Sequence, residues 1–276
     1  MKRLAVLGDP VAHSRSPVMQ SAALAALGLG GEWTYEAIRM PPADFAELTR
    51  ALPAEGFVGA NVTIPHKEAA LALADDASAA ATEIGAANTL TFRDDGGIRA
   101  DNTDAPGMLA ALGRTVAGSR ALVLGAGGSA RAAVWALATQ GAAVEVWNRT
   151  GERAAELVSS LSGVVANGAR LSAGSEEAAR SGHYDLLVNC TAIGLEPDDD
   201  PFEALPLELE SIGETAVLDL VYAHTGATAL VTAARERGAD VVDGLEVLVR
   251  QGAESLRIWT GLEPPLDVMR EAARRG

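Results

Sequence analysis

The sequence predicts an α/β protein made of two α/β domains. Short apolar runs rich in β-branched residues alternate with longer helical patterns, which is typical of largely parallel sheets covered by helices. A second strand–helix series begins near residue 119, after a first one that opens at the N-terminus. The length of 276 residues agrees with two domains of ordinary size. We therefore place a domain boundary near residue 104.

The first series opens with an apolar strand over residues 4–8. The helix after it begins near Ser16, with Pro17 in the first turn, where the missing amide of proline costs little. The Asp-Asp-Gly-Gly sequence of residues 94–97 predicts a hairpin turn between two short strands. Further strands are expected over residues 32–38, 56–62, 88–92 and 98–100, and helices over residues 16–28, 43–52, 67–74 and 77–84.

The second series consists of apolar strands, most of them followed by a helical segment. Strands are expected over residues 121–124, 144–147, 186–189, 217–220 and 240–242, and helices over residues 129–140, 151–161, 228–237 and 245–259. In the last of these helices, Leu245, Leu248, Leu256 and Trp259 form one apolar stripe. The segment 196–206 is acidic and rich in proline, so we expect a surface loop there.

Composition excludes several classes of protein. With 48% hydrophobic and 21% charged residues, the chain can bury a full core, so it is not intrinsically disordered. A net charge of −15 repels phosphate backbones and argues against nucleic-acid binding. The apolar run at residues 4–7 is too short for a signal peptide, and no stretch approaches the roughly 18 apolar residues of a membrane span.

The chain has one cysteine, Cys190. It cannot form an internal disulfide, and no cluster of cysteine and histidine offers a metal site. We therefore expect a cytoplasmic protein with no metal, no nucleic-acid partner and no membrane partner.

A glycine-rich turn stands between the strand at residues 121–124 and the next helix. Its spacing is Gly125-x-Gly127-x-x-Ala130, the form of the dinucleotide-binding fingerprint that allows alanine at the third position. Gly125 permits the tight turn, Gly127 lets the backbone approach a pyrophosphate, and the helix N-terminus attracts the phosphate charge. The pattern predicts a dinucleotide site, although an ordinary tight turn could also contain these glycines.

The strand at residues 144–147 is followed by Asn148, Arg149 and Thr150. NAD enzymes usually place Asp or Glu at this point to bind the ribose 2′-hydroxyl. Here Arg149 and Arg153 supply two guanidiniums instead, and these suit a 2′-phosphate. The sequence therefore favours NADP over NAD. The alternative is a solvated arginine pair at the start of a helix, which Thr150 could cap.

Lys67 is the one internal lysine. Of the 22 Lys and Arg residues, only Lys2 and Lys67 are lysines. An amine can exchange a proton near neutral pH when its surroundings are suitable, whereas a guanidinium cannot. Lys67 closely follows Pro65 and is expected to open a helix, where a cation opposes the helix dipole. This locally unfavourable placement predicts a general acid–base role, the alternative being chance retention of a surface lysine.

Polar clusters interrupt the apolar segments of the first half. Ser14 and Ser16, after the first strand, could offer two hydroxyls to a carboxylate, although Ser16 could instead cap the helix. Asn61 and Thr63 alternate onto one face of a strand. Two further clusters occupy residues 85–89 and 101–104. In the latter, Asp104 could hold the Lys67 ammonium or cap the next helix, and its neighbours could be turn or cap residues.

Taken together, these motifs resemble the shikimate dehydrogenase family. The resemblance rests on Asn-Val-Thr-Ile-Pro-His-Lys at 61–67, Ala-Asn-Thr at 87–89, Asp-Asn-Thr-Asp at 101–104, the glycine turn and Asn-Arg-Thr at 148–150. It continues through Asp-Leu-Val-Tyr at 219–222, the segment 243–253 and Trp-Thr-Gly at 259–261. The match therefore covers essentially the whole chain in the expected order.

The resemblance implies NADPH-dependent reduction of 3-dehydroshikimate to shikimate, in the biosynthesis of chorismate and the aromatic amino acids. Lys67 would transfer the proton, paired with Asp104. The substrate-binding residues would be Ser14, Ser16, Asn61, Thr63, Asn88, Asp104, Tyr222 and Gln251. The cofactor-binding residues would be Gly125, Ala126, Gly127, Gly128, Ser129, Asn148, Arg149, Thr150, Arg153, Leu220 and Gly244.

The family fold would divide the chain into a substrate-binding domain and a Rossmann-type NADP-binding domain, with the active cleft between them. The first domain would have a mixed, mostly parallel sheet and comprise residues 1–103 plus 244–276, and the second would comprise residues 104–243. The partner would be shikimate or 3-dehydroshikimate, and the protein would be a monomer or a homodimer.

Two rival functions are a quinate/shikimate dehydrogenase that uses NAD and a dinucleotide-binding regulator without catalysis. Arg149 and Arg153 speak against the first, and Lys67 with Asp104 against the second.

Two segments depart from the family pattern. Residues 189–194 are Asn-Cys-Thr-Ala-Ile-Gly, where the family usually has Asn-Ala-Thr-Ser-x-Gly. The serine missing at Ala192 is expected to alter cofactor affinity. The segment after Tyr222 lacks its usual proline, so we expect a more mobile loop over residues 223–228.

Overall fold

The computed structural model describes residues 1–165, 170–196, 198–223 and 226–275. It divides into two compact units, and each is an α/β structure with its own sheet, as the sequence predicts. One unit comprises Met1–Gly107 and Leu248–Gly276, and the other comprises Met108–Val247. The division falls inside two helices, α5 (Asp104–Leu112) and α11 (Gly244–Thr260).

The first unit contains a mixed sheet in the order β2-β1-β3-β5-β6-β4. The strands are β1 (Lys2–Gly8), β2 (Trp33–Arg39), β3 (Phe57–Val62), β4 (Asp76–Ala77), β5 (Thr89–Phe92) and β6 (Ile98–Asp101). β1 pairs in parallel with β2 and β3, whereas β5 runs antiparallel to β3 and β6. This sheet is therefore mixed, as the family resemblance implies.

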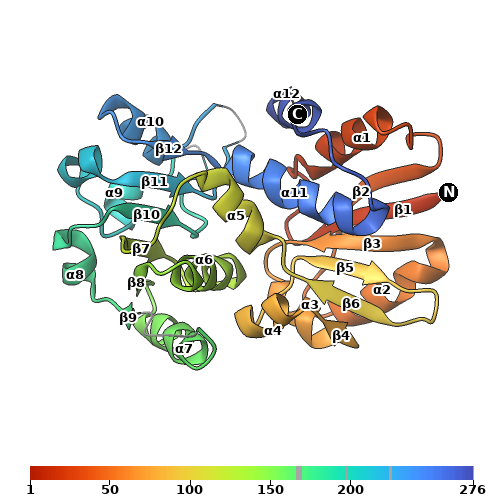
Figure 1. Ribbon diagram of the computed structural model, residues 1–276, viewed down its shortest axis with the longest axis horizontal. Helices are drawn as coiled ribbons and strands as arrows, with labels where there is room; N and C mark the ends of the chain where they lie inside the picture. The colour runs from red at the N-terminus through yellow and green to blue at the C-terminus, as the bar shows by residue number, and fades with distance from the viewer. Residues whose placement is uncertain (166–169, 197, 224–225, 276) are drawn as a thin grey trace. The chain divides into compact units, whose positions relative to one another are not determined.

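Helices cover both faces of this sheet (Figure 1). One face carries α1 (Ser16–Ala26), α11 and α12 (Leu266–Arg275), and the other carries α2 (Phe45–Ala51), α3 (Lys67–Leu73) and α4 (Ala79–Ile84). A short 3₁₀ turn, Leu52–Glu55, follows α2. Because both faces are covered, β1 is apolar throughout its centre, and Leu4–Leu7 are at most 3% exposed.

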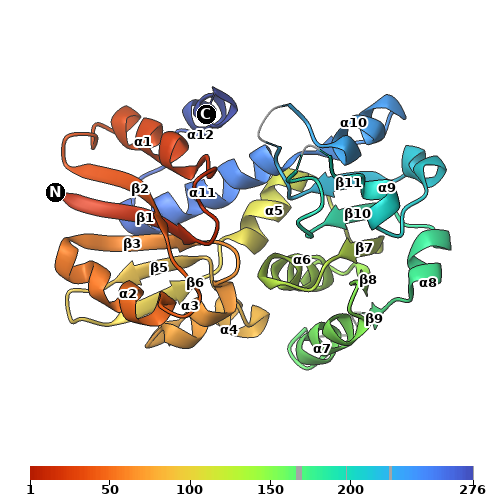
Figure 2. The same cartoon turned by 180° about the vertical axis from the view of Figure 1, so that it is seen from behind.

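The second unit contains a sheet in the order β12-β11-β10-β7-β8-β9, with parallel pairing throughout. The strands are β7 (Arg120–Leu124), β8 (Ala143–Trp147), β9 (Leu171–Ala173), β10 (Leu186–Asn189), β11 (Ala216–Asp219) and β12 (Val241–Val242). In Figure 2, α6 (Gly128–Thr139) and α7 (Gly151–Ser162) lie on one face, and α8 (Glu176–Ser181), α9 (Pro201–Ala204) and α10 (Ala229–Glu236) lie on the other.

The expectation of a loop over residues 196–206 is wrong for residues 201–204, and residue 197 lies outside the described residues. Asp200 accepts the amide of Phe202 at 2.8 Å, and Pro201 occupies the first turn of the short helix α9. The strands and α-helices that were not predicted include β4, β9, α8 and α12. The first three are two to six residues long, too short to show a helical or strand period. No helix among the described residues has the length and apolar character that crossing a membrane would require.

Candidate active site

The two residues predicted as catalytic are in direct contact. Lys67 is the first residue of α3, and its Nζ donates to Oδ2 of Asp104 at 2.7 Å. The two side chains are only 11% and 9% exposed. Burying both charged groups carries a desolvation cost that a solvent-exposed ion pair does not have. The contact between Lys67 and Asp104 is therefore not an ordinary surface ion pair.

Asn102, and not Asp104, caps the helix that follows. Its Oδ1 accepts from the Ala105 amide at 3.2 Å, and its Nδ2 donates to the Ala86 carbonyl at 2.9 Å. The Asp104 carboxylate is therefore not used as a cap. It accepts Lys67 on Oδ2 and Asn88 on Oδ1, and both of its oxygens are thereby held in place.

Asn88 connects the catalytic pair to α11. Its Nδ2 lies 2.8 Å from Asp104 Oδ1 and 3.2 Å from Gln251 Oε1, and the residue is 2% exposed. Its Oδ1 accepts from the Thr103 amide at 2.7 Å. Gln251 itself donates Nε2 to the Leu248 carbonyl at 2.9 Å. Lys67, Asp104, Asn88 and Gln251 thus belong to one hydrogen-bond network in the first unit.

Asn61 extends this network toward the interior. Its Oδ1 accepts from the Tyr35 hydroxyl at 2.8 Å, and its Nδ2 lies 2.8 Å from Ser255 Oγ and 3.2 Å from the Asn88 carbonyl. The sequence reasoning missed Tyr35 and Ser255. For Ser255 a signal existed, because it follows Gln251 by four residues and so lies on the same face of α11.

Ser14 and Ser16 are positioned by local contacts and by the C-terminal helix. Ser14 Oγ accepts from the Ser16 amide at 3.3 Å, and Arg15 occupies the position before the helix, so Ser16 does not cap α1. The buried Arg15 donates to the Ala273 carbonyl at 2.8 Å, near the end of α12. Thr63, half-buried, follows β3 and donates its amide to the Leu7 carbonyl at 2.8 Å.

The glycine turn of the second unit has the backbone that a dinucleotide site needs. Gly125 has a φ of +108°, and a Cβ there would lie 3.0 Å from the Cys190 carbonyl oxygen. Gly127 precedes α6, and a Cβ there would meet no atom within 4 Å. Glycine at 127 therefore leaves the space beside the start of α6 clear of a side chain, and the positive φ of Gly125 with the helix N-terminus after it fits the pyrophosphate of the cofactor that the sequence predicts.

Arg149 and Arg153 are both exposed beside the start of α7. Asn148 Nδ2 donates to the Thr150 carbonyl at 2.9 Å. Thr150 stands at the cap position of α7, but its side chain makes no capping bond. Gly244 is the first residue of α11 and follows β12. A Cβ on Gly244 would lie 2.7 Å from the carbonyl oxygens of Leu220 and Val221.

Asn189 and Asp219 form a buried polar pair, and the sequence predicted no role for either residue. They are register partners at the ends of β10 and β11, and Asn189 Nδ2 donates to Asp219 Oδ1 at 2.9 Å. Burial raises the pKa of Asp219 to about 6, and the hydrogen bonds from Thr228, Val221 and Asn189 oppose that rise. The sequence signal that could have identified this pair is its place within the Asn-x-Thr motif of residues 189–191 and the Asp-x-x-Tyr motif of residues 219–222.

The raised pKa of Asp219 predicts a pH-dependent stability. Between the ordinary carboxyl pKa of about 3.9 and about 6, the folded protein binds more protons than the unfolded chain, so stability falls as pH rises. Two pKa units correspond to about 3 kcal/mol. We expect Asp219→Asn to remove this slope, measured as the difference in unfolding free energy between parent and variant at pH 4 and pH 7.5. A difference that is equal at both pH values would contradict the assignment.

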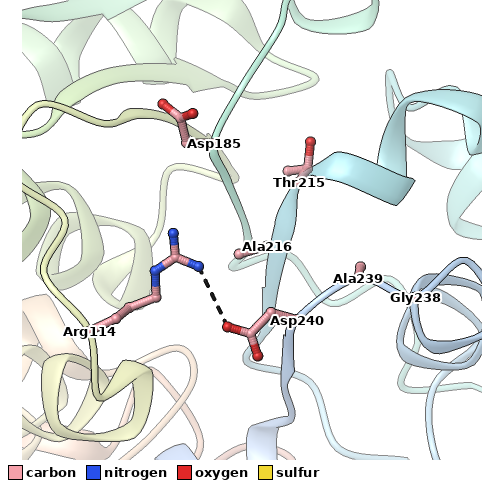
Figure 3. Close-up of a pocket in the computed structure, with 7 residues that line it drawn as sticks. All are labelled: Arg114, Asp185, Thr215, Ala216, Gly238, Ala239 and Asp240. Atoms are coloured by element: carbon pink, nitrogen blue, oxygen red, sulfur yellow. Dashed lines mark hydrogen bonds and ion pairs between the residues drawn. The ribbon is translucent and has the colours of Figure 1, made fainter.

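A polar cavity lies at the amino ends of strands in the parallel sheet, whereas the glycine turn follows the carboxyl end of β7. Figure 3 shows the residues that line this cavity. It measures about 250 Å³, and Asp185, Thr215 and Asp240 line it at the amino ends of β10, β11 and β12. An ion pair between Arg114 and Asp240 at 3.5 Å crosses it. Among the described residues, no group of three or more His, Cys, Asp or Glu is arranged to hold a metal ion.

Three family models match the chain in order. The model of the shikimate dehydrogenase substrate binding domain matches residues 6–90, that of shikimate/quinate 5-dehydrogenase matches residues 109–193, and that of the shikimate 5′-dehydrogenase C-terminal domain matches residues 244–274.

Similar proteins match over nearly the whole length. A shikimate dehydrogenase (NADP(+)) of Thermus thermophilus is 46% identical over 282 residues, covering 100% of this chain and 98% of the relative. One of Methylobacterium radiotolerans is 45% identical, covering 95% and 92%. The crystal structure of shikimate 5-dehydrogenase from Thermus thermophilus in complex with NADP(H) and shikimate superposes with a TM-score of 0.86 at 43% identity, covering 100% of this chain and 99% of that one.

Proposed function

This chain belongs to the shikimate dehydrogenase family, and on that premise we infer that it catalyses the reversible, NADPH-dependent reduction of 3-dehydroshikimate to shikimate. The enzyme is an NADP-dependent oxidoreductase of the shikimate pathway, which leads to chorismate and the aromatic amino acids. The single observation that carries the chemistry is the largely buried contact of 2.7 Å between Lys67 and Asp104.

Lys67 is the proposed proton donor for reduction and the acceptor for oxidation. When bound, NADPH supplies the hydride that reduces the ketone carbon of the substrate. Negative charge then develops on the ketone oxygen, and a positioned ammonium such as that of Lys67 can protonate it. Asp104 keeps the ammonium oriented through its 2.7 Å contact, and Asn88 fixes the other carboxylate oxygen at 2.8 Å. In oxidation the same groups act in reverse.

The remaining substrate residues are proposed to bind a carboxylate and ring hydroxyls. Ser14, Ser16 and Tyr222 would hold the carboxylate. Asn61, Thr63, Asn88, Asp104 and Gln251 would line the ring. The network of Asn88, Asp104 and Gln251 supports this role, because its members hold one another in fixed positions before the substrate arrives.

The cofactor residues are proposed to divide between the two ends of NADP. Gly125, Ala126, Gly127, Gly128 and Ser129 would hold the pyrophosphate, and Leu220 and Gly244 would lie near the nicotinamide. Asn148, Arg149, Thr150 and Arg153 would bind the adenosine side with its 2′-phosphate.

Arg149→Ala tests the preference for NADP. We expect the parent to prefer NADP over NAD by at least about tenfold, on the order of 1.4 kcal/mol. The variant should bind NADP more weakly and NAD almost as before, because only NADP has the 2′-phosphate. The measurement is the dissociation constant of each cofactor by fluorescence. An equal loss for both cofactors would refute the role of Arg149.

Ser14→Ala tests the carboxylate site. The hydroxyl bonded to a charged group is expected to contribute about 1.5–3 kcal/mol, so KM for shikimate should rise while NADP affinity stays unchanged. The control is a substrate analogue without the carboxylate. If that analogue suffers the same penalty, the hydroxyl is not the partner of the carboxylate.

Turnover of shikimate with NADP and with NAD, under the same conditions, tests the function as a whole. Turnover preferring NADP supports it, preference for NAD would indicate the rival quinate/shikimate dehydrogenase, and absence of turnover with either would refute it. A cytoplasmic location and a monomeric or homodimeric state are also proposed, and sedimentation velocity measures the latter.

A further inference from the structure

We infer that Asp219 is a positioning residue for NADP: its buried carboxylate holds the two segments that follow β10 and β11 in the arrangement that the nicotinamide half of the cofactor needs. This inference rests on the proposed function. Asp219 opens the Asp-Leu-Val-Tyr motif of residues 219–222, and none of the binding or catalytic roles proposed above falls on it.

The location of Asp219 connects it to the cofactor edge of the sheet. Asn189 pairs with Asp219 on one side and with Leu124 on the other, and Leu124 directly precedes the glycine turn. The Cys190 carbonyl, one residue beyond Asn189, is the atom that a Cβ on Gly125 would approach to 3.0 Å. In parallel sheets, ligands bind at this carboxyl edge, so the pair lies where a dinucleotide is bound.

The carboxylate binds Val221, which follows β11, and Thr228, which precedes α10. Its Oδ1 accepts the Val221 amide at 3.1 Å, and its Oδ2 accepts the Thr228 hydroxyl at 2.6 Å. Leu220 and Tyr222, the residues proposed near nicotinamide and substrate, flank Val221 in the chain. Fixing Val221 therefore restricts the backbone of both.

Asn189 extends the same restraint to the segment after β10. Its Nδ2 donates to Asp219 Oδ1 at 2.9 Å and to the Ile193 carbonyl at 3.2 Å, and its Oδ1 accepts the Thr191 hydroxyl at 2.8 Å. The two segments also approach each other, since a Cβ on Gly194 would lie 3.4 Å from the Thr228 methyl. One aspartate thus organises two neighbouring segments.

A stability role alone would favour an uncharged residue at this position. Asp219 is 0% exposed, and its pKa of about 6 means that it is ionised at pH 8 at a cost in stability. An ionised carboxylate accepts several donors at once, which a buried apolar residue cannot do. A role in holding the two segments for cofactor binding explains why an ionised carboxylate stands here despite its cost in folding stability.

Thr228 offers the sharpest test, because Asp219→Ala would take the carboxylate away from three buried donors at once and would disturb the fold. Thr228→Val keeps the shape and removes the hydroxyl, and Thr228→Ser keeps the hydroxyl. Thr228 also caps α10 by accepting the Val231 amide at 3.1 Å. The matched control is Ser175→Ala, which removes the corresponding cap of α8, also 3.1 Å from its amide, without touching Asp219.

The measurements are the affinities of NADP and of adenosine 2′,5′-bisphosphate, which lacks the nicotinamide half, at pH 8. For Thr228→Val we expect NADP to bind about tenfold more weakly, and the bisphosphate to bind as in the parent. In the protein without cofactor, the Val221 amide should exchange its hydrogen about tenfold faster. Thr228→Ser should restore both values to within about twofold, and Ser175→Ala should change neither.

The inference is overturned if Thr228→Val binds NADP as tightly as the parent does, or if it loses affinity for both ligands equally. It is also overturned if Thr228→Ser fails to restore the affinity, or if Ser175→Ala weakens NADP to the same degree. A parent that binds neither NADP nor the bisphosphate would refute the proposed function, and this inference with it. These outcomes distinguish a failure of the inference from a failure of the function.

Discussion

Lys67→Arg is expected to lose about as much kcat as Lys67→Ala, on the order of 10²–10⁴-fold. If Lys67 supplied only positive charge, arginine would be a mild replacement. If it transfers a proton, arginine fails, because a guanidinium stays protonated near neutral pH and does not give its proton up. The planar guanidinium is also larger than the ammonium whose Nζ contacts Asp104 at 2.7 Å, in a site where the lysine side chain is only 11% exposed.

The measurement is kcat for shikimate oxidation across pH, with NADP affinity followed by fluorescence as the control. NADP should still bind to both variants, because Lys67 lies in the first unit and is not among the residues proposed to bind the cofactor. An arginine variant within about threefold of the parent would make Lys67 an electrostatic anchor. Proton transfer would then be reassigned, with Asp104 or a bound water as the next candidate.

Asp104→Ala is expected to lower the free energy of unfolding by about 3–5 kcal/mol. The substitution removes the carboxylate that contacts the largely buried ammonium of Lys67, and it removes one of the acceptors of Asn88 Nδ2. The double variant Lys67→Met/Asp104→Ala should be more stable than Asp104→Ala alone, because it no longer buries the Lys67 charge without the Asp104 carboxylate. Urea unfolding of the three proteins gives these values.

The matched control is Asp76→Ala, which breaks an ion pair with Arg99 of nearly the same length, 2.6 Å. Those side chains are 44% and 41% exposed, so the loss should stay within about 1 kcal/mol. Equal losses for Asp76→Ala and Asp104→Ala would show that burial contributes nothing to the cost at Asp104.

Some of the candidate site could be predicted because its signals are local. The glycine turn places Gly125 between a strand and a helix within about ten residues, and its φ of +108° is the conformation that glycine favours. The hairpin at residues 94–97 is equally local, since Gly96 has a φ of +85° and Arg93 bonds to Gly97. Such features depend on residues that are close together in the chain, so they can be predicted from the sequence.

Other features of the site depend on residues that are far apart in the chain, so the sequence left their alternatives open. Both Asn102 and Asp104 could cap the helix on local grounds, and only the folded chain, which brings Lys67 and Asn88 to Asp104, decides in favour of Asn102. The roles of Tyr35 and Ser255 depend in the same way on their contacts with Asn61, one of which spans 194 residues.

By itself, the sequence determined the α/β class, the order of most elements, the dinucleotide turn and the residue types available for chemistry, because periodicity and turn chemistry act over a few residues. The tertiary structure alone decided which polar side chains are paired, which helix each one caps, and how deeply Lys67, Asp104 and Asp219 are buried. Those properties depend on contacts between distant segments, and the same contacts set the cost of each buried charge.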